Sequence, residues 1–172
     1  MTMTFLGIPV EGDIASTKRT PQRPLEDLAP LMQALLDDDG IARFGWRQYT
    51  PYFNDGDACE FSAGSLWVAR PEDLDPDDPE TVDAEELDVD YGSPLGSYEG
   101  GEWVPDPDNP GCNHRVGMTY SGPDRDRYDR CKALSAAIDS GQFDNVLLEA
   151  FGDHANISVA REGITVECYE HD

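Results

Sequence analysis

Apolar and polar positions along the chain follow two periods, one typical of helices and one typical of strands. The helical spacing of three to four residues recurs in residues 25–39, 121–141 and 144–151. Residues 41–49 and 58–69 are rich in aromatic and apolar side chains, and a two-residue alternation of apolar and polar residues marks residues 155–172. The order therefore predicts one helix, a pair of strands, two helices and a second pair of strands.

Turn signals between the strands indicate how they pair. Asn54-Asp55-Gly56 separates the first two strands and favours a tight reversal. Arg161-Glu162-Gly163 separates the last two and fits a type I turn with Gly163 in a left-handed bulge. Two hairpins and two or three helices predict an α+β fold, in which helices cover one face of an antiparallel sheet of about four strands. We expect residues 1–172 to form one domain.

The ends of the predicted helices carry their own signals. Asp27 and Asp144 are the expected N-caps of the first and third helices, which leaves Pro30 in the first turn, where its missing N–H costs little. Gly40 is the expected left-handed residue beyond the first helix. Residues 37–39 are three aspartates at the negative end of that helix dipole, each unfavourable by roughly a few tenths of a kcal/mol. The local sequence offers no reason for them.

Negative charge is the most unusual feature of the composition. The chain has 36 acidic and 12 basic residues, a net charge of −24. Residues 71–114 hold 15 of the acids and no Lys or Arg, with many prolines and glycines, so we interpret them as an acidic insertion within the domain. Apolar residues such as Val82 and Leu87 are scattered through it and allow parts of it to pack on the core. We expect no direct binding to nucleic acid or to an anionic membrane, because phosphate contacts need Lys and Arg.

The carboxylates in the first half of the insertion are the candidate partner-binding residues, since they can attract a basic protein surface. They are Asp73, Asp75, Asp77, Asp78, Glu80, Asp83, Glu85, Glu86, Asp88 and Asp90. In one form of this hypothesis they imitate the charge of nucleic acid at a basic site. Such a mimic needs rigid and regularly spaced carboxylates, which a loop broken by prolines presents poorly.

A second candidate site begins at the loop between the first two strands. Its candidate surface residues are Tyr49, Tyr52, Asn54, Asp55 and Asp57. The two aspartates can bind a divalent cation or orient a hydroxyl group, but two carboxylates are too few ligands for a metal on their own. Other ligands must therefore converge on this loop if it is a site.

The C-terminal hairpin can supply such ligands, because one strand of a hairpin begins at the end of the sheet where the other finishes. Asp153 and His154 precede the first of these strands, and His171 and Asp172 follow the second. With Asp55 and Asp57, these four residues make the tentative metal site. The alternative is that Asp55-Gly56 is only a turn, that Asp153 and His154 belong to a solvated loop, and that the protein has no cofactor.

Cysteines and chain termini bear on the compartment. Cys59, Cys112, Cys131 and Cys168 are far apart and are expected to be free thiols. Cys131 and Cys168 fall on apolar faces of their elements and are expected to be buried. The first ten residues lack the basic region of a signal peptide, and no apolar run approaches the roughly 20 residues of a membrane helix. These features favour the cytosol.

Two stretches resemble a family of small, uncharacterised proteins of tailed bacteriophages and some bacteria. They are WRQYTPYFNDGDACEF (46–61) and LLEAFGDHANISVAREGITVECYEHD (147–172), and the family pattern is W-x-Q-Y-T-P-Y-F-N-D-G-D-x-C-x-F with F-G-D-H and a closing Y-x-H-D. The resemblance implies a phage-encoded protein in a bacterial host cytosol, whose two loops belong to one surface. It supplies no activity, and residues 71–114 lie outside the pattern.

Three functions remain open. The first is a non-enzymatic interaction protein that uses the insertion to bind a basic host protein, and inhibition of host function or defence is one form of this hypothesis. The second is a metal-dependent enzyme or small-ligand binder built on Asp55, Asp57 and the C-terminal hairpin. The third is a structural or accessory phage protein. We rank the first ahead of the others, since 15 acids fall in one segment without Lys or Arg and further acids lie where the helix dipole disfavours them.

Overall fold

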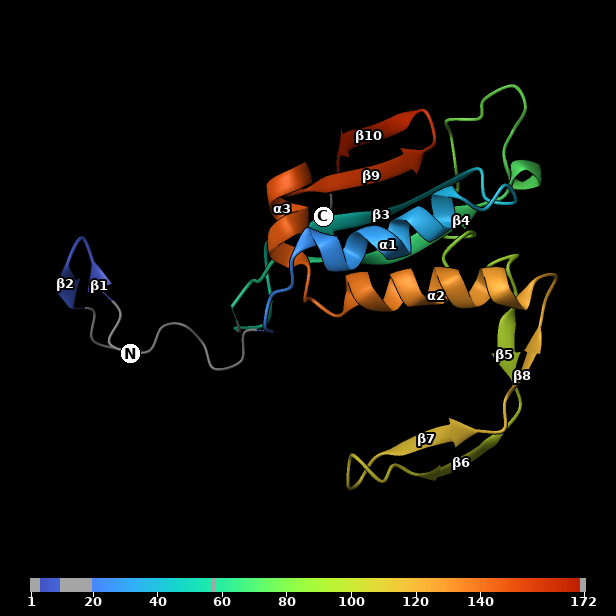
Figure 1. Ribbon diagram of the computed structural model, residues 1–172, viewed down its shortest axis with the longest axis horizontal. Helices are drawn as coiled ribbons and strands as arrows, with labels where there is room; N and C mark the ends of the chain where they lie inside the picture. The colour runs from blue at the N-terminus through green and yellow to red at the C-terminus, as the bar shows by residue number, and fades with distance from the viewer. Residues whose placement is uncertain (1–3, 10–19, 57, 171–172) are drawn as a thin grey trace.

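The computed structural model describes residues 4–9, 20–56 and 58–170 (Figure 1). Its helices are α1 (Leu25–Leu36), α2 (Arg125–Asp139) and α3 (Asp144–Phe151), with a short 3-10 helix, η1 (Pro71–Asp73). Its strands are β1 (Thr4–Phe5), β2 (Ile8–Pro9), β3 (Arg43–Tyr49), β4 (Ser62–Ala69), β5 (Ser97–Glu99), β6 (Glu102–Pro105), β7 (Asn113–Val116), β8 (Thr119–Ser121), β9 (Ala155–Ala160) and β10 (Gly163–Cys168). No helix in this described part of the chain is long and apolar enough to cross a membrane.

A four-stranded antiparallel sheet in the order β10-β9-β3-β4 forms the centre of the fold. β3 and β4 are one hairpin, β9 and β10 are the other, and β3 pairs with β9 to join them. Helices cover one face of this sheet (Figure 1). The predicted α+β fold, with two hairpins in a sheet of four strands and three helices, is therefore confirmed.

The main core lies between the sheet and the helices. Its largest fully buried side chains include Trp46, Phe44, Phe143, Leu28, Leu35, Leu66, Leu134, Ile138, Leu147 and Ile157. Cys131 is buried among them, as expected, and burial raises the pKa of its thiol to about 12. Cys168 is exposed, contrary to expectation, because every residue of β10 remains exposed at the edge of the sheet.

Both ends of α1 differ from the sequence prediction. The helix begins at Leu25 with Pro24 as N-cap, so Pro30 lies inside the helix and Asp27 does not cap it. Burial of Leu28 and Leu35 stabilises the helix in spite of this proline. Gly40 is not the left-handed residue, and its N–H donates to the carboxylate of Asp38 at 2.9 Å.

Other element ends also differ. Asp144 is the first residue of α3 and does not cap it; Phe143 takes the N-cap position. In the loop between β3 and β4, Asp55 and Gly56 both have positive φ, as the turn signal predicts. Gly163 pairs directly with Ala160, so the C-terminal hairpin closes through a two-residue turn without the expected bulge. The full register of β9 with β10 leaves no extra residue for a bulge to absorb.

The first part of the acidic insertion packs on the face of the sheet opposite the helices. Trp67 and Ala69 of β4 point to this face and are buried against Leu87, with Leu74 and Val82 packed around them. Residues 87–89 run along the outer edge of β4, where Val68 N–H donates to Leu87 O and Val89 N–H to Leu66 O. Apolar side chains spaced along the insertion therefore dock it, and it covers the β4 edge of the sheet.

The second part of the insertion, together with residues 115–121, forms an arm that projects from the body beside α2 (Figure 1). β5 pairs with β8, and β6 pairs with β7. At its base the rings of Tyr98, Tyr120 and Tyr128 lie within 5.7 Å of one another, and Tyr120 Oη donates to Leu95 O at 2.6 Å. The arm is thus tied to α2 by aromatic contacts.

Candidate interaction surface

The acidic loop, residues 75–86, presents most of the candidate partner-binding carboxylates to solvent. Those that are exposed are Asp75, Asp77, Asp78, Glu80, Asp83, Glu85 and Glu86. None of these seven has an ion pair with a basic residue within the described ranges of the chain. Among the described residues no ion pair offsets their mutual repulsion, and a cationic partner would relieve it.

Two of these carboxylates hold the acidic loop in shape. Asp75 accepts the backbone N–H of Asp77 at 2.9 Å. Asp83 accepts the N–H groups of Glu85 and Glu86 at 3.1 and 3.2 Å. Such aspartate turns satisfy backbone donors that the loop would otherwise leave to water. Together with the packing of Leu74 and Val82 on Trp67, they give the loop a defined conformation.

Asp73 has an internal partner in Arg70. The Arg70 guanidinium donates to both carboxylate oxygens of Asp73, at 2.8 and 2.7 Å, and the Arg70 N–H donates at 2.9 Å. The Arg70 side-chain hydrogen bonds hold the pKa of Asp73 below its usual range, although burial opposes this. Asp73 therefore anchors the start of the insertion and offers little to a partner.

Asp88 and Asp90 also have contacts inside the molecule, although Asp90 itself is exposed. Asp88 is 7% exposed, and burial raises the pKa of its carboxyl group. Asp90 pairs with Lys132 of α2 and accepts a hydrogen bond from Ser135 Oγ at 2.8 Å. The contacts of Asp90 attach the first part of the insertion to α2. The candidate interaction surface is accordingly the seven exposed carboxylates of the acidic loop.

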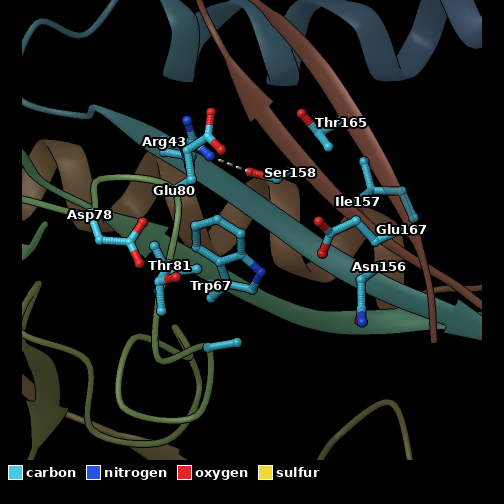
Figure 2. Close-up of a pocket in the computed structure, with 12 residues that line it drawn as sticks. Arg43, Trp67, Asp78, Glu80, Thr81, Asn156, Ile157, Ser158, Thr165 and Glu167 are labelled. Carbon is cyan, nitrogen blue, oxygen red and sulfur yellow. Dashed lines mark hydrogen bonds between the residues drawn. The ribbon is translucent and has the colours of Figure 1, made fainter. Parts of the chain in front are cut away.

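A groove separates the acidic loop from the open face of the sheet (Figure 2). Its volume is about 460 Å³, and a second hollow of about 410 Å³ shares several of its lining residues. On the sheet side, the groove is lined by Arg43 of β3, Trp67 of β4, Ser158 of β9, and Thr165 and Glu167 of β10. Asp78, Glu80 and Thr81 face them from the loop in Figure 2.

The groove is polar, with carboxylates on both sides. Arg43 is its basic residue, and one of its Nη atoms donates to Ser158 Oγ at 3.5 Å. Glu80 and Asp78 stand on one wall and Glu167 on the other. Because acids outnumber the single arginine, the groove suits a cationic side chain more than an anion.

The loop between β3 and β4 does reach Asp153, as a shared site would require. Asp153 accepts Thr50 N–H at 2.8 Å, Thr50 Oγ at 2.7 Å and His154 N–H at 2.8 Å. Burial raises the pKa of Asp153, but these hydrogen bonds outweigh it and leave the pKa below its usual value. Both carboxylate oxygens are thus engaged in holding the loop to the start of β9.

Aromatic contacts extend this junction. The rings of Tyr52 and His154 stack at 5.0 Å, and those of Tyr49 and Tyr169 lie 5.1 Å apart. Asn54 donates to Ala58 O at 3.0 Å within the loop. The structure thus brings the start of the loop, the start of β9 and the end of β10 together at one end of the sheet.

The tentative metal site extends beyond the described residues. Asp57, His171 and Asp172 lie outside them, and Asp55 is exposed at the turn with a φ of 39°. Within the described ranges, no group of three His, Cys, Asp or Glu side chains is arranged to hold a metal ion. Within the described residues, Tyr49 and Tyr52 of this loop contact the rings of Tyr169 and His154.

Sequence reasoning missed the groove residues on the sheet. The signal was present, because the polar groove residues alternate with apolar residues along their strands; they are Arg43, Asn156, Ser158, Thr165 and Glu167. Which strands lie side by side, and where the insertion packs, is not visible in that alternation. Comparisons with models of known protein families, with curated proteins and with solved structures found no match.

Proposed function

We propose that this chain is a non-enzymatic interaction protein that binds a basic surface of a bacterial host protein through the acidic loop. The observation that carries the proposal is the loop itself, with seven exposed carboxylates that form no ion pair in the described part of the chain, on a backbone docked against Trp67. A loop that is already ordered loses less conformational entropy on binding than a flexible tail of the same charge. The net charge of −24 adds long-range attraction to any basic partner.

The resemblance of both hairpins to phage proteins supports a bacterial cytosol as the place of action. A phage protein of this kind would occupy a basic site and inhibit host function or defence. Imitation of nucleic acid is the narrower form of the proposal. It requires the partner to bind DNA or RNA through the same surface.

The proposal is tested by capture from bacterial lysate with matched charge variants. One variant neutralises Asp77, Asp78, Glu80 and Glu86 as the corresponding amides, which keeps the turn-forming Asp75 and Asp83. The control variant neutralises the same number of exposed acids elsewhere, at Glu99, Glu102, Asp108 and Glu149. We expect a basic protein to be retained at low salt by the wild type and the control. The loop variant should lose it, as should the wild type at about 0.5 M salt, where charges are screened over a few Å.

The proposal would be contradicted if the loop variant still retained the partner, or if the wild type captured no protein. Competition with duplex DNA tests the narrower form. If DNA displaces the protein from its partner, the acidic loop occupies a nucleic-acid site. If DNA leaves the complex intact, the partner has a basic surface of another kind.

The alternative function is cation or small-ligand binding at the junction of Asp55 and Asp57 with the C-terminal hairpin. The contacts of Thr50 and Tyr52 with Asp153 and His154 favour it. Thermal unfolding with and without Mg²⁺, Ca²⁺, Mn²⁺ or Zn²⁺ tests it, because a ligand that binds the native state raises the transition temperature. An unchanged transition with all four ions would exclude the metal form of this function.

A further inference from the structure

The outer edge of β10 is an unprotected sheet edge. β10 is the last strand of the sheet, and no strand in the described part of the chain pairs with its outer side. At the other end of the sheet, residues 87–89 cover β4. Natural proteins protect such edges with proline, lysine or a bulge. The sequence of β10, GITVEC, has neither residue, and its continuous register with β9 has no bulge.

Backbone groups on this edge point outward at alternate residues. The hairpin closes through two residues, so Ala160 and Gly163 form a hydrogen-bonded pair and the pattern alternates from there. The Tyr169 N–H donates to His154 O at 2.7 Å, which fits the same alternation. Thr165 and Glu167 therefore bond inward to β9. Ile164, Val166 and Cys168 direct their N–H and C=O groups away from the sheet.

The two faces of β10 differ in chemistry. Ile164 and Val166 lie on the helix side, opposite the buried Val159 and Ile157, yet they are 50% and 46% exposed. On the other face Thr165 and Glu167 line the groove beneath the acidic loop (Figure 2). An added strand would therefore meet an uncovered extension of the core on one side and carboxylates on the other.

We propose that β10 accepts an extended segment of a basic protein as a fifth strand of the sheet. Main-chain hydrogen bonds to Ile164, Val166 and Cys168 would hold it in place, as in other cases of strand addition. Alternate apolar side chains of the segment cover Ile164 and Val166. The intervening Lys or Arg side chains face Glu167 and, across the groove, Glu80. This inference rests on the proposed function, and it specifies how the basic partner docks.

Charge decides between this occupant and a second copy of the chain. Two copies joined through β10 would each bring a net charge of −24, with the acidic loops on the same face as the joined edge. Repulsion between them opposes such a dimer. A lysine-bearing strand instead meets Glu162 and Glu80 around the second hollow, which also borders Ile164 and Thr165. The geometry and the charge favour the same partner.

The test uses a fluorescent seven-residue peptide with alternating lysine and valine, KVKVKVK. The control peptide, KKKKVVV, has the same composition without the alternation. We expect fluorescence anisotropy at low salt to show that the alternating peptide binds roughly tenfold more tightly than the control peptide. This ratio corresponds to a difference in binding free energy of about 1.4 kcal/mol. Equal binding of the two peptides would overturn the proposal, because charge alone would then explain it.

Amide hydrogen exchange measured by NMR gives a residue-level test. The N–H groups of Ile164, Val166 and Cys168 should become protected when KVKVKVK binds. Those of Thr165 and Glu167, which already bond to β9, should change much less. Protection confined to the acidic loop, with no change in β10, would overturn the proposal. Light scattering that shows a dimer disrupted by a change at β10 would also overturn it, since a second copy would then occupy the edge.

A lysine on the edge strand is the matched mutational test. Val166→Lys places a charged side chain at an exposed position of β10 and should abolish peptide binding. Val116→Lys makes the same change at an exposed position of the arm and should leave binding intact. If the acidic-loop variant loses the host protein while Val166→Lys keeps it, the strand inference fails and the proposed function stands. If Val166→Lys loses it and the loop variant keeps it, the proposed function fails.

Discussion

Asp38, just beyond the end of α1, is held by Arg127 of α2. Arg127 Nε donates to one carboxylate oxygen at 2.9 Å, and Nη2 donates to the other at 3.0 Å. Arg130 adds a third hydrogen bond, and Arg161 donates to the main-chain carbonyls of Leu36 and Asp38. The unfavourable position of an aspartate at a helix C-terminus is thus offset by three arginines that lie nearby in the fold.

Replacement of Asp38 should destabilise the protein more than replacement of its neighbour. Asp38→Asn removes a charge-assisted pair whose acid is only 10% exposed, and we expect a loss of about 1–3 kcal/mol. Asp39→Asn is the control, because that side chain is fully exposed and only approaches Arg161 at 3.9 Å. Urea unfolding at neutral pH measures the unfolding free energy of both variants. Equal stability of the two variants would contradict a stabilising role of the Asp38 ion pairs.

The contribution of Asp38 should also depend on pH. The Arg127 hydrogen bonds hold the pKa of Asp38 far below its usual range, in spite of partial burial. A carboxyl group with a lowered native pKa stabilises the fold above its unfolded pKa of about 3.9 and loses that contribution as the pH falls below it. The difference in unfolding free energy between wild type and Asp38→Asn should therefore shrink below about pH 4. A constant difference from pH 7 to pH 3 would count against this assignment.

A side chain at Gly45 would separate elements that now touch. A Cβ at this position would lie 2.0 Å from Ile157 O of β9 and 2.5 Å from the Trp67 ring. Gly45→Ala should therefore cost about 3 kcal/mol or more through overpacking. Gly163→Ala is the matched control in the same sheet, because its Cβ would meet no atom within 4 Å. Thermal unfolding compares the two, and similar transition temperatures would contradict the close packing of β3, β9 and Trp67.

The sheet and helices could be predicted from sequence because each hydrophobic period is local. The alternation in β9 and β10 and the helical spacing in α2 identify elements without any knowledge of what they touch. The ends of the helices were predicted less accurately, since α1 begins at Leu25 with Pro24 as its N-cap, although Asp27 is the better capping residue. The apolar contacts of Leu28 and Leu35 with the sheet favour the longer helix, and these contacts are tertiary.

The candidate site was only partly predictable for a related reason. The charge of the acidic loop is visible in the sequence, but the separation of Asp73, Asp88 and Asp90 from the exposed carboxylates is not. Lys132, which pairs with Asp90, lies 42 residues further along the chain. Likewise, Arg127, which stabilises Asp38 at the end of α1, lies 89 residues further along the chain. Long-range pairs of this kind leave no local pattern.

Leu87 should control the order of the acidic loop. Its side chain packs on Trp67 and Ala69, and its carbonyl accepts the Val68 N–H at 3.1 Å. Leu87→Ala should cost about 2–4 kcal/mol by removing buried apolar contact. It should also make residues 75–86 more sensitive to limited proteolysis than the arm. Val104→Ala, at a partly exposed site on the arm, is the control and should leave the cleavage pattern of the acidic loop unchanged. If Leu87→Ala leaves both stability and cleavage unchanged, the loop is not held by this contact.

Asp144 should make the protein less stable as the pH rises. Its Oδ1 atom is buried without a hydrogen-bond donor within the described chain, and burial raises the pKa of the carboxyl group to about 6, against a smaller opposing effect of Ala63 N–H. The native state therefore favours the protonated form. The resulting stabilisation is complete below the unfolded pKa of about 3.9 and is lost as the pH rises through about 6.

Asp144→Asn tests this linkage, because an amide keeps the shape of the protonated acid without its titration. We expect the variant to be more stable than the wild type above pH 6 and to lack the decline between about pH 4 and pH 7 that Asp144 causes. Asp126→Asn is the control, an exposed acid in the first turn of α2 that should leave the pH dependence unchanged. Urea unfolding at several pH values measures all three proteins. A decline that persists in Asp144→Asn would instead be assigned to Asp88 or Asp139, whose pKa values are also raised by desolvation.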